Sequence, residues 1–135
     1  MDPIIEPATG RPSVVTTAVG LLLLSIAIGL LTSSLRVAQQ VSGAPLMLGL
    51  LIVFAFFALF LFLVSRIRAG RNGARIILLV LVLIGLPFAI PAYIVEFRKN
   101  VLSGSVSMLI ALLQLVGTCL LFTSNSNSWF RARKQ

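Results

Sequence analysis

The chain has 135 residues, of which 59% are hydrophobic and 10% are charged, and its mean hydropathy is +1.09. Soluble domains carry about 25% charged residues, so this composition excludes a water-soluble fold and indicates one membrane domain over residues 1–135. The net charge of +8 is accompanied by one cysteine and no histidine, which excludes an intramolecular disulfide, a His/Cys metal cluster and a haem attachment site.

Four apolar runs fill the chain, over residues 14–35, 46–65, 76–95 and 101–122. A helix needs about 20 residues to cross a hydrocarbon core of about 30 Å, and each run meets that length. The first run is longer than the apolar region of a signal peptide, so we expect it to be retained. The sequence predicts an all-α bundle of four antiparallel transmembrane helices with short loops and a cytoplasmic tail over residues 123–135.

The basic residues divide unequally between the two sides of the predicted bundle. Eight of the eleven lie in the terminal segments and the second connection, and three lie on the other side. The positive-inside rule therefore predicts cytoplasmic termini, with anionic headgroups as partners and no nucleic acid. The candidate headgroup contacts are Arg66, Arg68, Arg71, Arg75, Trp129, Arg131, Arg133 and Lys134.

Small and polar residues form one stripe on the first predicted helix and another on the fourth. Their spacings of three, four and seven residues place each set on one helix face. Close approach at small residues is a main source of helix association in lipid, so we expect these faces to form a polar seam. Its candidate residues are Ser25, Gly29, Thr32, Ser103, Ser107, Gln114 and Thr118.

Gln114 lies near mid-membrane, where an amide facing lipid is unfavourable. We expect it to face the first helix or another subunit, and the alternative is that it lines a pore or contacts a substrate. The second helix is rich in phenylalanine, which indicates packing or a lipid-facing surface.

The third predicted helix contains a candidate kink at Gly85, Pro87 and Pro91. Each proline removes one backbone donor, so the carbonyls of Leu83 and Pro87 lose their helical partners. We expect a kink that shapes packing in a small bundle, and the alternative is a binding site, since interrupted helices recur at the binding sites of transporters.

The second half of the chain resembles a family of small bacterial inner-membrane proteins with four helices and uncharacterised activity. The motifs are a Gly-Arg-Asn-x-Ala-Arg turn at residues 70–75, a Leu-Pro-Phe-x-x-Pro kink at residues 86–91, and Glu96 shortly afterwards. A Ser-x-x-Trp-Phe element follows at residues 126–130. The chain departs from the family pattern at Gly73, where a tryptophan is expected. The resemblance implies a four-helix membrane protein and supplies no catalytic residue or ligand.

Composition also narrows the possible functions. No acidic residue lies deep in a predicted helix, which argues against proton-coupled transport. Paired carboxylates are missing as well, so we expect no enzymatic activity, catalytic residue, cofactor or metal. The leading prediction is an accessory or interaction subunit that forms a homo-oligomer or binds another membrane protein. The alternatives are a homo-oligomeric channel or membrane-permeabilising protein, and a small-molecule or lipid carrier.

Overall fold

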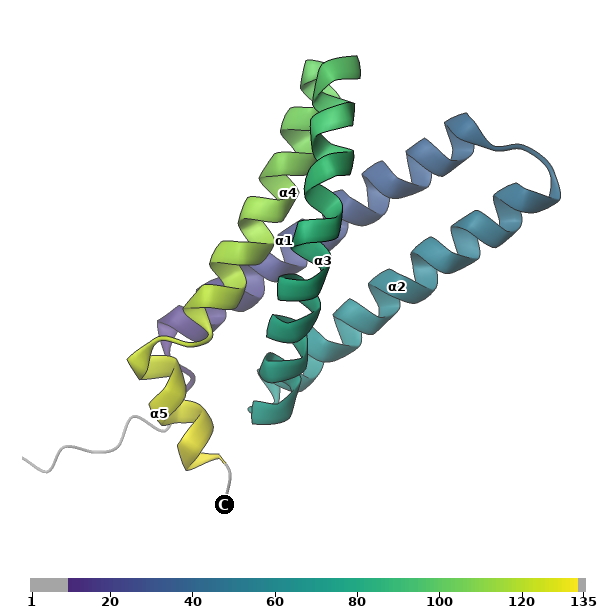
Figure 1. Ribbon diagram of the computed structural model, residues 1–135. Helices are drawn as coiled ribbons and strands as arrows, with labels where there is room; N and C mark the ends of the chain where they lie inside the picture. Colours follow the sequence, from purple (N-terminus) through teal and green to yellow (C-terminus); the bar gives the residue numbers. More distant parts are fainter. Residues whose placement is uncertain (1–9, 134–135) are drawn as a thin grey trace, which may run out of the picture.

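The computed structural model describes residues 10–133, and this part of the chain is helical, with no strand. Its elements are α1 (Ser13–Gln40), α2 (Ala44–Arg68), α3 (Asn72–Lys99), α4 (Val101–Leu120) and α5 (Ser124–Ala132) (Figure 1). The first four are long and apolar enough to cross a membrane, which confirms the predicted all-α fold of a multi-pass membrane protein.

The first three helices are longer than the apolar runs, α4 ends two residues earlier than its run, and the connections between the four long helices are shorter than predicted. Only residues 41–43, 69–71, 100 and 121–123 lie between helices. Hydropathy detects the apolar part of each helix, whereas the backbone hydrogen bonds continue through polar ends. Arg36, predicted to lie in a connection, is therefore inside α1.

Two of the connections are tight because their residues hydrogen-bond the backbone groups that are left unpaired at the helix ends. Gly70 has a φ of +82°, and the N–H of Arg71 donates to the carbonyl of Arg66 at 3.1 Å, which is the glycine-dependent stop of a Schellman motif. Asn100 alone joins α3 to α4. Its side chain accepts hydrogen bonds from backbone N–H groups two and three residues ahead, at 3.0 and 3.3 Å.

The helices pack closely at one end of the bundle, which we call the α5 end because α5 lies there (Figure 1). The buried apolar residues come from the start of α1, the end of α2, the start of α3 and α5. Toward the opposite end, α2 and α3 diverge from their shared connection: α2 runs beside α1, and α3 runs beside α4 (Figure 1). The main core therefore occupies one half of the bundle and leaves the other half more open.

α3 is helical without interruption through Pro87 and Pro91. Both prolines are exposed on the surface of the bundle, and Gly85 lines a pocket between the helices. The third helix is therefore continuous. Its two prolines, which lack a backbone N–H, lie in the segment that forms one wall of this pocket.

The segment predicted as a cytoplasmic tail contains α5, which folds back onto the bundle. Arg75 of α3 is buried, and its Nη1 donates to the carbonyl of Leu121 at 3.0 Å and to Oδ1 of Asn127 at 2.7 Å. Its guanidinium also lies 5.0 Å from the ring centroid of Phe122 and 4.5 Å from that of Phe130. Arg75 thus joins the start of α3 to the α4–α5 corner.

This arrangement corrects two of the candidate headgroup contacts. Arg75 and Trp129 are only 7% and 8% exposed, so both contact protein rather than lipid headgroups. Charge counting cannot separate a buried arginine from an exposed one, because burial depends on where α5 docks. The other candidates among residues 10–133 are exposed or half-buried at the α5 end, namely Arg66, Arg68, Arg71, Arg131 and Arg133. Lys134 lies outside the described residues.

Candidate functional site

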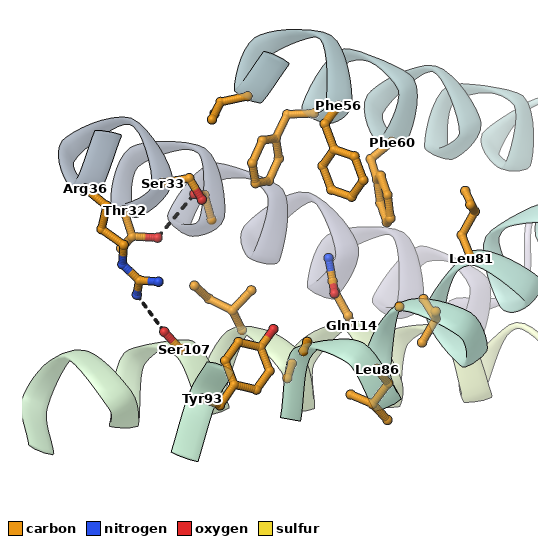
Figure 2. A pocket seen from close by; sticks show the side chains of 18 of the residues that line it. Thr32, Ser33, Arg36, Phe56, Phe60, Leu81, Leu86, Tyr93, Ser107 and Gln114 are labelled. Carbon is orange, nitrogen blue, oxygen red and sulfur yellow. Dashed lines mark hydrogen bonds between the residues drawn. The ribbon is translucent and has the colours of Figure 1, made fainter. Parts of the chain in front are cut away.

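A pocket of about 380 Å³ lies among the four long helices, away from the α5 end. Figure 2 shows its residues: Phe56 and Phe60 enter from α2, while Tyr93 and Gln114 enter from α3 and α4 on the opposite side. Arg36 closes one end. The pocket therefore has a polar end, an aromatic wall and a single amide between them.

The polar end is organised by an ion pair between Arg36 of α1 and Glu96 of α3. Nη2 of Arg36 also donates to Oγ of Ser107 at 2.6 Å. The hydroxyl of Ser107 donates to Oε2 of Glu96 at 2.9 Å, and Ser103 donates to Oε1 of the same carboxylate. Three helices thus meet in one hydrogen-bonded network, and the two charges balance each other in a partly buried setting.

Part of this network remains free to receive a ligand. A guanidinium has five N–H donors, and within residues 10–133 only those on Nη2 of Arg36 have hydrogen-bond partners. The Tyr93 hydroxyl and the Gln114 amide point into the pocket (Figure 2), and neither side chain makes a hydrogen bond to another described residue. Hydrogen-bond donors on three helices therefore converge on the same space.

The opposite wall is aromatic and is shaped by a glycine. The rings of Phe56 and Phe60 lie 4.9 Å apart between centroids. A Cβ on Gly29 would lie 2.9 Å from Cε1 of Phe57, so the missing side chain gives this ring its place against α1. The phenylalanines of α2 therefore serve both packing and the pocket lining, and Phe56 lines the pocket although about half of its surface is exposed, as for Phe54 and Phe62.

Three of the seven predicted seam residues donate hydrogen bonds only within their own helix, whereas Ser103 and Ser107 donate to Glu96 of α3. Ser25 donates to the carbonyl of Leu22 at 2.8 Å, and Thr32 donates to that of Ile28 at 2.9 Å. Thr118 donates to the carbonyl of Gln114 at 2.7 Å. The hydrogen bond that crosses from α1 to α4 comes from Arg36, which was not among the candidate residues.

Sequence reasoning missed the pairing of Arg36 with Glu96. The two residues are far apart in the chain, and Glu96 is flanked by Arg98 and Lys99, which offered nearer partners. One signal was present: Arg36 and Glu96 both fall at the ends of predicted helices on the same side of the membrane. Their positions predict proximity only once α1 and α3 are known to pack against the same helix, α4.

Comparison with known protein families, curated proteins and solved structures finds no match to this chain. The fold and the pocket therefore define the class of protein, which is a helical multi-pass membrane protein with a polar-ended pocket among its helices.

Proposed function

We propose that the protein binds a membrane-dissolved amphiphile in this pocket and acts as a carrier or receptor for it. The observation that supports this proposal is that Arg36, Tyr93 and Gln114 direct free hydrogen-bond donors into one pocket, opposite an aromatic wall and within one chain. A volume of about 380 Å³ falls in the range of small-molecule sites, which are mostly apolar with a few placed polar groups.

The lining gives the ligand an orientation. Its polar head would accept hydrogen bonds from Arg36 and Tyr93 near one membrane surface. Its apolar body would lie against Phe56 and Phe60 toward the middle of the bundle. Because Glu96 already neutralises Arg36, a head with hydrogen-bond acceptors fits better than a cation.

Of the three functions predicted from the sequence, we therefore favour the carrier over the accessory subunit and the channel. Ser107 and Gln114 of the polar stripe line a pocket inside one chain, which supports a binding site more directly than a pore between subunits. No feature of residues 10–133 favours an accessory subunit over other membrane roles. We propose binding rather than catalysis, since the network at Glu96 is a balanced ion pair.

Filling the pocket should abolish binding. Gly85 lines the pocket, and a Cβ there would meet no atom within 4 Å, so Gly85→Phe would place a ring in the pocket without an immediate clash. With purified protein and a photoactivatable, alkyne-tagged fatty acid, we expect Gly85→Phe to reduce labelling at least tenfold. Peptide mapping should locate the wild-type label on α2 and α4.

The matched control is Gly20→Phe, at an exposed α1 position that also has nothing within 4 Å of a Cβ. It should label like the wild type. Equal labelling of the two variants, or a label confined to the outer helix surfaces, would contradict the proposed site.

We also propose that the α5 end faces the cytoplasm of a bacterial cell, as the positive-inside rule predicts. In a Cys119→Ala background, Ser42→Cys lies in the connection between α1 and α2, whereas Ser128→Cys lies on the exposed face of α5. An impermeant maleimide applied to spheroplasts should label position 42 at once and position 128 only after permeabilisation. Labelling of position 128 in intact spheroplasts, with position 42 protected, would contradict the proposed orientation.

A further inference from the structure

A second feature of the structure points to a ligand at the α5 end, independently of the pocket. The guanidinium carbons of Arg11 and Arg133 lie 5.9 and 5.0 Å from the ring centroid of Trp129. Nη2 of Arg11 donates to the carbonyl of Arg68 at 2.8 Å. We call Arg11, Arg133 and Trp129 the arginine–tryptophan cluster.

The α2–α3 turn leaves room for the Arg133 side chain of this cluster, because residue 70 is a glycine. A Cβ on Gly70 would lie 2.9 Å from Cδ of Arg133, so the side chain of Arg133 rests directly on the α2–α3 turn. The left-handed conformation of Gly70 ends α2 at this point. The segment before α1, the α2–α3 turn and the end of α5 therefore meet at one indole ring.

The charge of this region is unbalanced. The α5 end also holds Arg66, Arg68, Arg71, Arg75 and Arg131. Within residues 10–133 the single acidic residue is Glu96, which pairs with Arg36 near the opposite end. Two guanidinium groups on one ring repel each other, and the cation–π attraction offsets only part of that repulsion. An anion that contacts both guanidinium groups would relieve the remainder.

We infer that the two exposed arginines of the arginine–tryptophan cluster, Arg11 and Arg133, bind the phosphate group of an anionic phospholipid in the leaflet at the α5 end, while the buried Trp129 ring holds them in place. Arginine presents paired N–H donors that match phosphate oxygens. Anionic headgroups are concentrated at the membrane surface, where arginine-rich segments meet them. Arg11 and Arg133 are both exposed, so a headgroup can reach them from the surface of the bundle. The bound lipid would fasten the segment before α1 to α5.

The experiment is a lipid titration of the full chain in detergent, followed by native mass spectrometry. Phosphatidylglycerol and phosphatidylcholine with identical acyl chains serve as probes. We expect the first phosphatidylglycerol to bind at least tenfold more tightly than phosphatidylcholine. Arg133→Gln should weaken phosphatidylglycerol binding about fivefold, and Arg11→Gln combined with it should remove the preference.

Arg98→Gln is the matched control, since it removes one exposed arginine at the opposite end of α3. It should leave the first binding constant unchanged, and circular dichroism should give equal helix content for all variants. An equal loss in Arg98→Gln, or no preference for phosphatidylglycerol in the wild type, would overturn the inference. Displacement of the bound lipid by inorganic phosphate at millimolar concentration would also overturn it, because the site would then serve a free anion.

Discussion

Gly104→Ala is expected to destabilise the bundle by about 2 kcal/mol. Gly104 of α4 faces the backbone of Phe97 in α3, and an added Cβ would lie 2.7 Å from Cβ of Phe97 and closer still to its Cα. Because a backbone atom cannot rotate away, the two helices must separate. Overpacking of this kind costs about 1–3 kcal/mol, and the better helix propensity of alanine offsets up to about 1 kcal/mol. Reversible unfolding in mixed detergent micelles would measure the change.

Gly20→Ala provides the control for that experiment. It makes the same chemical change in a helix where a Cβ would meet nothing within 4 Å. We expect this variant to be as stable as the wild type or slightly more stable. If both variants unfold at the same detergent composition, the close contact between α3 and α4 does not constrain the bundle.

Arg75→Met is expected to loosen α5 from the bundle. The change removes the hydrogen bonds to the Leu121 carbonyl and to Asn127, and the contacts with two aromatic rings. A charge-assisted hydrogen bond contributes about 1.5–3 kcal/mol and a desolvated cation–π contact up to about 2 kcal/mol, so the docking of α5 should weaken by about 3 kcal/mol. Trp129 is the single tryptophan of the chain, so its fluorescence reports directly on this docking.

The measurement is the emission maximum of Trp129, which should shift to longer wavelength as the buried indole becomes exposed. Arg75→Lys should behave like Arg75→Met, since a lysine ammonium lacks the second guanidinium nitrogen, Nε, that donates to Asn72 while Nη1 donates to Leu121 and Asn127. Arg71→Met, which removes an exposed arginine nearby, should leave the spectrum unchanged. A wild-type spectrum for Arg75→Met would mean that the burial of Trp129 and Phe130 alone holds α5 in place.

The four long helices were predictable because each depends on a local property, the length of an apolar run. The stripes of small and polar residues also predicted that the first and fourth helices pack together, because small residues let two helices approach closely. In the structure α1 and α4 do pack against each other. The pocket was not predictable, because it arises from the divergence of α2 and α3, which depends on contacts such as Gly29 with Phe57 and Gly104 with Phe97.

The α5 helix and its contacts show a second limit of sequence reasoning. Residues 124–132 are mostly small and polar, so they gave no apolar run to recognise. The position of α5 depends on long-range contacts with Arg75 and with the segment before α1. The sequence contains each residue involved, but neither hydropathy nor charge counting pairs them.

The packing of α1 against α4 has a consequence for biogenesis. Among the four long helices, α1 leaves the ribosome first, and α4, against which it packs extensively, leaves last. Until α4 has been inserted, the α1 face that holds Ser25 and Gly29 lacks its neighbour in the folded bundle. α5 emerges later still, so the end of the bundle that it covers closes only after all four long helices have been made. The membrane insertion machinery must therefore shelter or tolerate an incomplete bundle while α2, α3 and α4 are synthesised.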